Sequence, residues 1–316
     1  MRKELIALVT ILSLFLVIVG CTSDTSVKTP GAFVGGTNGL DLSFISEEPP
    51  DTVLDNNQDL FYVTVAIENK GEFDIPANKI ISSLSGIDKD SFQISSMDIK
   101  LNRDLPGVSQ SRSKVIMGGE DELEFGQAKY RYDLNADFTT TLRADVCYLY
   151  ETDAVASVCL KKNAAAQRDK EDVCAINNAN VNLEVSGAPV QIANVDQRPS
   201  GSDAVRLTFD VVKKATSGEV YAPDTFSNNC RDQDPKKNIF EVEVSSAKAS
   251  IPINCGVLSN SNEGNTKLAE NSKTINCVIK TSGLQDTAFN TPINIKLRYF
   301  YKDAISKNLV VQDANK

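Results

Sequence analysis

The sequence predicts an all-β protein: two tandem antiparallel β-sandwiches behind an N-terminal signal and a flexible tether. Two observations carry this prediction. Apolar and polar residues alternate along many short segments, and several of these segments recur in the same order in the second half of the chain. A period of two is typical of a strand with one buried face. The length of 316 residues leaves room for two domains of roughly 150 residues.

The first twenty residues have the pattern of an export signal. Arg2 and Lys3 precede the run from Leu5 to Val19, which contains only two polar residues. A charged n-region followed by an apolar h-region is typical of a signal peptide. The run is also shorter than the roughly 20 residues that a membrane-spanning helix needs. We therefore expect residues 1–20 to be a signal peptide, with an uncleaved membrane anchor as the alternative.

The segment Ile18-Val19-Gly20-Cys21 resembles the lipobox of bacterial-type and archaeal lipoproteins. The resemblance implies that Cys21 becomes the first residue of the mature chain and carries a lipid. Acyl chains would then hold the protein at the extracytoplasmic face of the cell membrane. The residues from Thr22 to Asn38 are rich in Thr, Gly, Ser and Pro, which is typical of a flexible tether. We expect residues 21–38 to form the lipidated cysteine and this tether.

Strand-like alternation dominates the rest of the chain. The odd positions of Phe61–Glu68 are all large and apolar, and Asn69-Lys70-Gly71 then marks a turn. The same alternation recurs in Leu142–Tyr148, Val205–Val211 and Ile293–Tyr299, whereas helical patterns of any length are nearly absent. We interpret these segments as strands of antiparallel sheets.

Three pairs of segments match at a nearly constant offset, which indicates an internal duplication. The pairs are Gly39–Phe44 with Gly187–Ile192, Asp59–Asn69 with Asp203–Lys213, and Leu142–Tyr150 with Ile293–Tyr301. We predict one sandwich over residues 39–162 and another over residues 172–316. The polar stretch Lys161–Lys170 would join them, and each sandwich should bury enough apolar surface to fold independently.

The strand leading into Glu68-Asn69-Lys70-Gly71-Glu72, and a hairpin from Cys147 to Cys159, resemble adhesion-type immunoglobulin-like modules of archaeal and bacterial surface lipoproteins. The resemblance covers both halves and rests on turns and alternation. It implies immunoglobulin-like β-sandwiches at a cell surface and carries no active site. The second half departs from it, because Val211–Gly218 replaces the short turn and its last hairpin lacks the cysteine pair.

Six cysteines remain when Cys21 is assigned to a lipid, and an even number in an exported chain favours disulfides. They are Cys147, Cys159, Cys174, Cys230, Cys255 and Cys277. A zinc site or a redox dithiol is the alternative. It is disfavoured by the absence of any Cys-x-x-Cys motif and of any His.

The strand register narrows the fifteen possible pairings. If Cys147 faces Cys159, the hairpin turns near Thr152-Asp153-Ala154 and one face is consistently apolar. We expect this bridge first. The other expected pairs are Cys255 with Cys277, at the ends of two strand-like segments, and Cys174 with Cys230 by elimination.

Composition excludes several functions. The formal net charge of −9 argues against a nucleic-acid partner, because phosphate binding needs a basic surface. The absence of His excludes Ser-His-Asp and Cys-His catalysis and every His-ligated metal centre. We therefore expect no enzyme, cofactor or metal, with a hydrolase that uses carboxylates alone as the remaining enzymatic alternative.

Three groups of side chains could carry chemistry, and each has a structural interpretation that we favour. Asp232 and Asp234 alternate as calcium ligands can, but the full loop pattern is missing and a solvated loop fits better. The acidic run Glu120–Glu124 suits the wet face of a strand. The third group could form an aromatic platform, but core-edge packing fits it better. It comprises Tyr148, Tyr150, Tyr299 and Tyr301.

The sequence thus predicts a non-enzymatic, lipid-anchored protein whose loops bind a protein or a glycan of the envelope or outside the cell. Sandwich-end loops can vary without disturbing a core. We therefore select Phe73 and Asp74 in one loop, and Asp224 and Phe226 in another, as candidate binding residues. The alternative is a structural spacer or accessory subunit of a cell-envelope assembly.

Overall fold

A computed structural model describes residues 33–111, 114–177, 181–246 and 251–316 and confirms the predicted all-β fold. The expected signal peptide and Cys21 lie outside these residues. The described part contains one short 3₁₀ helix, Asp234–Lys236. None of its helices is long and apolar enough to cross a membrane.

Two smaller sheets each contain strands from one half of the chain. In the first half the order is β1-β3-β8, and in the second it is β11-β12-β17-β15. The first sheet consists of β1 (Leu40–Phe44), β3 (Phe61–Asn69) and β8 (Glu120–Ala128). The second consists of β11 (Val190–Pro199), β12 (Ala204–Lys213), β17 (Ser272–Lys280) and β15 (Ile253–Cys255). All pairings within both sheets are antiparallel.

A large sheet combines strands from both halves in the order β16-β14-β18-β9-β4-β5. This path consists of β16 (Glu263–Lys267), β14 (Ile239–Ser246), β18 (Phe289–Gln312), β9 (Phe138–Leu160), β4 (Ile80–Ser85) and β5 (Asp98–Lys100). Three short strands join it off this path: β10 (Asn182–Val185) on β9, and β13 (Glu219–Tyr221) and β2 (Thr52–Leu54) on β18. A separate ribbon pairs β6 (Ser109–Ser111) with β7 (Lys114–Ile116).

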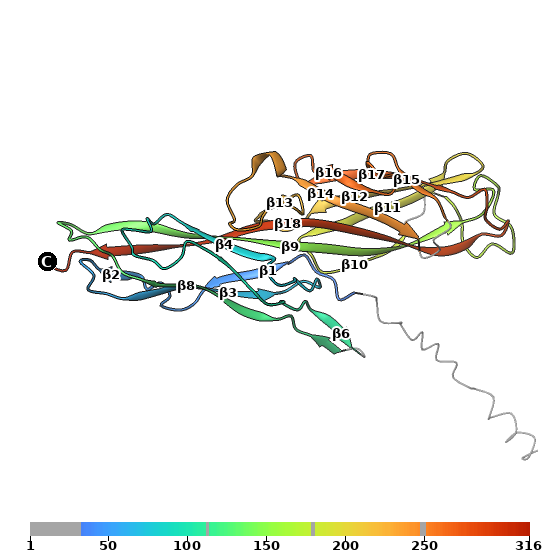
Figure 1. Cartoon of the computed structure of the whole chain (residues 1–316). Coiled ribbons are helices and arrows are strands. Elements are labelled where there is room, and N and C mark those ends of the chain that lie inside the picture. Colours follow the sequence, from blue (N-terminus) through green and yellow to red (C-terminus); the bar gives the residue numbers. More distant parts are fainter. Residues whose placement is uncertain (1–32, 112–113, 178–180, 247–250) are drawn as a thin grey trace, which may run out of the picture. The chain divides into compact units, whose positions relative to one another are not determined.

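The central strands β9 and β18 run through both sandwiches (Figure 1). They contain 23 and 24 residues and pair from Leu160 opposite Phe289 to Phe138 opposite Val311. Every even-numbered residue of β9 from Leu142 to Leu160 is buried. The first small sheet packs along one half of these strands and the second along the other, so the two sandwiches share one continuous core.

The two halves are arranged about an approximate two-fold axis through the pair Leu149 and Phe300. The duplication predicted from sequence matches Leu149 with Phe300, and these residues lie directly opposite each other in the sheet. Strand β4 beside β9 mirrors β14 beside β18. Equivalent hydrogen bonds accompany this relation: Leu40 N–H donates to the Tyr148 hydroxyl at 3.1 Å, and Val190 N–H donates to the Tyr299 hydroxyl at 3.3 Å.

The shared strands change the predicted domain division. The stretch Ala32–Lys316 forms one compact unit, so the sandwiches are not separate bodies joined by a linker at Lys161–Lys170. The sequence predicts a boundary there because strand alternation stops at the end of β9. That end does not separate the halves, because β18 returns along the full length of β9.

The predicted bridge between Cys147 and Cys159 is wrong, because no hairpin forms there. Strand β9 continues through Thr152-Asp153-Ala154, and twelve residues of strand place the two cysteines about 40 Å apart. The structure pairs Cys147 with Cys230 and Cys159 with Cys174, which also overturns the predicted bridge between Cys174 and Cys230. The expected bridge between Cys255 and Cys277 does form, across the register of β15 and β17.

A second, smaller core lies on the opposite face of the large sheet. Leu149 and Phe300 point to this face, since successive side chains alternate along a strand. The segment after β13 covers them with Phe226, and the Cys147–Cys230 disulfide fastens that segment to β9.

Candidate functional site

The two aromatic residues predicted to bind a partner serve the interior. Phe73 is half-buried and packs edge to face on Tyr150, with ring centroids 5.6 Å apart. Phe226 is only 5% exposed and packs on Tyr221 and Phe300, with centroids at 5.0 and 5.5 Å. Because Tyr150 and Phe300 point to opposite faces of the large sheet, the two loops do not form one surface.

The two acidic loop residues are exposed but engaged locally. Asp74 accepts a hydrogen bond from Gly107 N–H at 2.7 Å, which fixes the loop before β6. Asp224 makes an ion pair with Lys236 at 2.7 Å, and hydrogen bonding to that lysine lowers the pKa of Asp224. Both carboxylates therefore organise their own loops.

The four tyrosines pack in the core rather than forming a platform, but they lie deeper than the core edge that the sequence favours. Each is at most 1% exposed, and burial raises the pKa of all four phenols. They are Tyr148, Tyr150, Tyr299 and Tyr301. Two hydroxyls bond the first residues of β1 and β11 and two bond loop carbonyls, so they cannot present a platform to a sugar or peptide.

The aspartates of the calcium-like motif do not converge. Asp232 lies 2.5 Å from the Lys302 ammonium, and this contact lowers the pKa of the Asp232 carboxyl. Asp234 begins the 3₁₀ helix. The described residues contain no group of acidic or cysteine side chains suited to a metal ion.

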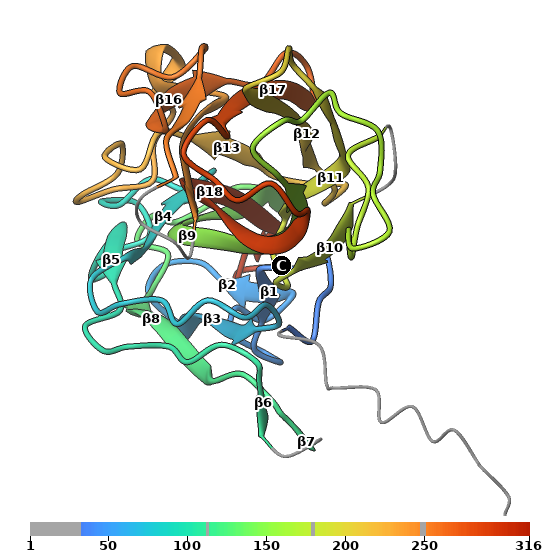
Figure 2. The same ribbon diagram turned by 90° about the vertical axis from the view of Figure 1, so that its right-hand side faces the viewer.

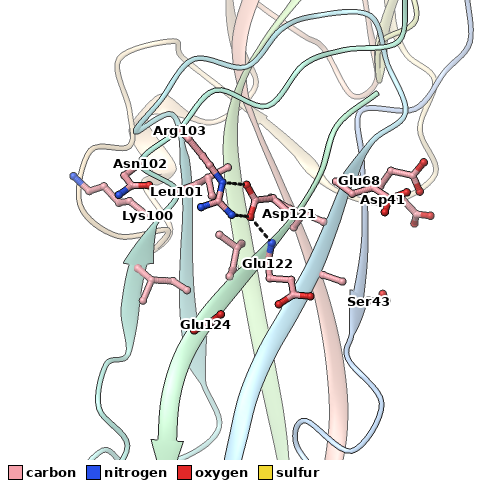
Figure 3. A pocket seen from close by; sticks show the side chains of 15 residues that line it. Asp41, Ser43, Glu68, Lys100, Leu101, Asn102, Arg103, Asp121, Glu122 and Glu124 are labelled. Carbon is pink, nitrogen blue, oxygen red and sulfur yellow. Dashed lines mark hydrogen bonds and ion pairs between the residues drawn. The ribbon is translucent and has the colours of Figure 1, made fainter. Parts of the chain in front are cut away.

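A long groove of about 880 Å³ lies at one side of the first sandwich (Figure 3). Strand β8 borders it on one side, and β5 with the following residues 101–103 borders it on the other. Each is the last strand of its sheet. The groove therefore lies where the two sheets of the sandwich open at their edges.

Acidic side chains line the groove in register. Asp41, Glu68 and Glu120 stand opposite one another on β1, β3 and β8. Glu122 and Glu124 continue the row on the exposed face of β8. The alternation in Glu120–Glu124 thus forms the wet strand face that the sequence predicts.

Two basic residues neutralise part of this charge. Arg103 makes a two-pronged ion pair with Asp121 (Figure 3), and this hydrogen bonding raises the pKa of Arg103. Lys70 pairs with Glu68, and hydrogen bonding to Glu68 likewise raises the pKa of Lys70. Within the described residues, no ion pair forms at Glu120, Glu122 or Glu124.

Among the described residues β8 has no partner strand along the same stretch on the side away from β3, and the Glu122 N–H donates instead to the Asp121 carboxylate at 2.7 Å (Figure 3). Asn69 N–H donates to Gly119 O at 2.9 Å, so alternation places the backbone groups of Glu120 and Glu122 on the side away from β3. In the described part of the chain, no strand pairs with β8 on that side. Ser95 and Ser96 cover the edge only further on, with hydrogen bonds to Gln127 and Phe125. The groove thus combines free carboxylates with a strand edge that lacks a partner strand and whose Glu122 N–H is bonded to Asp121.

Sequence reasoning identified the acidic strand but missed the groove. The segment that faces β8 comes from β5 and Leu101–Arg103, about twenty residues earlier, and nothing in its composition marks it as a partner. The one signal in the sequence was the change at Gly119, where a stretch without acidic residues meets four acids within five residues.

Comparison with known proteins assigns no function to this groove. No protein-family model matches the sequence, and no curated protein matches it. The site is therefore interpreted from its own residues.

Proposed function

We propose that this protein is a non-catalytic, membrane-anchored lipoprotein of the extracytoplasmic face, whose immunoglobulin-like sandwiches bind another protein. The cysteines carry the proposal. All six body cysteines are used in three disulfides, bonds that persist in exported proteins. Cys21 remains for a separate role, and it follows a signal-like segment directly.

The start of the folded body supports a tether. Glu72 accepts hydrogen bonds from the backbone N–H groups of Val34 and Gly35, each at 2.8 Å, and from Gly187 N–H at 2.6 Å. One carboxylate thus fixes the point where the chain enters the body. The eleven residues between Cys21 and Phe33 would reach about 40 Å when extended.

The groove favours a protein over a glycan as the partner. None of the described residues that line it is aromatic, whereas bound sugars commonly stack on aromatic rings. An open strand edge can instead accept an extended peptide through backbone hydrogen bonds. The unpaired carboxylates of Glu120, Glu122 and Glu124 would select a peptide that carries Lys or Arg.

The structural alternative, a spacer or accessory subunit of an envelope assembly, has support from the same feature. Open edges on both β8 and β5 suit lasting contact with a neighbouring subunit. The identity of the captured partner separates these functions: a stoichiometric envelope component indicates a subunit, and varied or foreign partners indicate adhesion.

The anchor is tested by labelling cells with a clickable fatty acid while they express the full chain or its Cys21→Ser variant. We expect label on the full chain and none on the variant. Cys21→Ser changes none of the disulfide cysteines, so the variant should fold and remain detectable. Label retained on the variant would contradict lipidation at this residue.

Binding in the groove is tested by placing a photo-crosslinking amino acid at Glu122 of the full chain in intact cells. The matched control carries it at Glu243, an exposed glutamate on β14 of the second sandwich. We expect protein adducts from position 122 that position 243 does not give. Identical adducts from both positions would argue against the groove.

A further inference from the structure

The β6–β7 ribbon exposes apolar side chains that nothing in the described chain covers. Figures 1 and 2 show it projecting beyond the first small sheet. All of its described residues are exposed, and Val115, Ile116 and Met117 are 52%, 52% and 62% exposed. A two-stranded ribbon is marginally stable alone in water, and consecutive exposed apolar residues mark a contact surface.

The ribbon and the groove have opposite charge. From Leu105 to Gly119 the sequence has no acidic residue and two basic ones, of which Lys114 lies on β7. The next five residues, Glu120–Glu124, include four acids. These complementary segments are consecutive in sequence, yet the ribbon points away from the body and does not fold back on β8 (Figure 2). A second molecule could bring these charges together.

We propose that the β6–β7 ribbon of one molecule lies in the β8–β5 groove of a second copy of this chain. Lys114 would then face the unpaired carboxylates of Glu120, Glu122 and Glu124. The apolar residues that follow Lys114 would cover Ala66 and Ile99 on the groove surface. This inference rests on the binding role proposed for the groove and names its partner.

The contact is reciprocal. Only Met117, Gly118 and Gly119 separate β7 from β8, so each molecule carries both surfaces side by side. A two-fold axis between two molecules would place each ribbon in the other's groove and form both contacts at once. The resulting assembly is a closed dimer.

An anionic membrane is a poorer occupant for the ribbon. The apolar triplet and Lys114 would suit a lipid surface, but the acidic row at Asp41, Glu68 and Glu120 lies beside the ribbon base. Anionic headgroups would repel that row. Complementary charge favours the groove.

The test uses two differently tagged full-length copies in one cell, with a photo-crosslinking amino acid at Ile116 of one copy. We expect an adduct with the other tag, of twice the monomer mass. Lys114→Glu in both copies should weaken pairing roughly tenfold or more, because like charges then face each other. Adding Glu122→Lys to that variant should restore the adduct. Lys267→Glu, at an exposed strand lysine in the second sandwich, is the matched control and should have no effect.

The outcomes separate this inference from the proposed function. An adduct that depends on Lys114 and is rescued by Glu122→Lys supports the dimer, and rescue also shows that the variants fold. Crosslinks from Ile116 to lipid, or to a different protein only, overturn it. In the latter case groove adducts at Glu122 would still support protein binding. Dimers that form equally well when both copies carry Lys114→Glu also overturn the proposed contact.

Discussion

Asp172 is an acid held in its charged form by its neighbours. Its side chain is 1% exposed and lies 2.9 Å from the Lys161 ammonium. It also accepts hydrogen bonds from the backbone N–H groups of Ala288 at 2.6 Å and Asp169 at 2.9 Å. These bonds, led by that of Ala288, lower the pKa of Asp172 to about 2.

The stabilisation from Asp172 should therefore depend on pH. An aspartate in an unfolded chain has a pKa of about 3.9. A lower pKa in the folded state stabilises the protein above pH 4, and this stabilisation is lost as pH falls from about 4 to about 2. We expect Asp172→Asn to lower the urea midpoint markedly at pH 7 and little at pH 2.

The control for this titration is Asp286→Asn, at a side chain that is 86% exposed. Its urea midpoint should follow that of the unmodified protein at every pH. A difference between Asp172→Asn and the unmodified protein that stays constant from pH 7 to pH 2 would contradict the role assigned to Asp172.

The disulfides fasten segments over very different spans. Cys147–Cys230 closes 83 residues and holds the segment after β13 on the large sheet, whereas Cys159–Cys174 closes only 15. Restricting the longer loop removes more entropy from the unfolded chain. Replacing the first pair by Ser should cost roughly 4.5 kcal/mol of unfolding free energy, and replacing the second roughly 3 kcal/mol.

Denaturant unfolding of the two double-Ser variants checks this order, and peptide mapping without reduction checks the pairing. The map should join the Cys147 peptide to the Cys230 peptide. A peptide linked internally between Cys147 and Cys159 would restore the hairpin that the sequence suggested, and equal costs for the two variants would contradict the entropic account.

The sequence predicts which segments form strands far better than it predicts whether one strand continues without a turn. Phe61–Glu68 was expected as a strand and β3 covers Phe61–Asn69, because alternation is a local property. The residues from Leu142 to Leu160 have the same alternation whether they fold as a hairpin or as one strand. What decides between the two is β18, a strand one residue longer than β9 that starts more than a hundred residues later.

The groove escaped prediction for the same reason. Exposed Glu120, Glu122 and Glu124 can be read from spacing alone, but an open edge is known only when the sheet order is known. Phe226 shows the converse: its loop looked accessible, while the Cys147–Cys230 disulfide pulls it onto a core face that local sequence cannot reveal.

The whole body should unfold as one unit, although sequence suggested two independent sandwiches. Both contribute to one core through β9 and β18. Phe209 is fully buried in β12 of the second sandwich, so Phe209→Ala should cost about 3–5 kcal/mol. Because both sandwiches unfold in one transition, the same loss of unfolding free energy should be measured in the first sandwich.

Amide hydrogen exchange at Val63 and Val65 of β3 reports on the first sandwich and exchange at Leu207 of β12 on the second. We expect Phe209→Ala to accelerate both by the same factor under conditions where exchange follows global unfolding. Lys267→Glu, which changes an exposed side chain of β16, serves as the control. Acceleration confined to β12 would show that the sandwiches unfold independently.

The approximate two-fold axis through Leu149 and Phe300 bears on how the duplicated chain arose. A chain with a single copy of the repeat would end in one long strand, and two such chains could pair those strands to build the same central sheet. Fusing the copies makes that pairing permanent within one polypeptide. It also leaves one Glu72 contact, at the point where the chain enters the body, to serve both sandwiches.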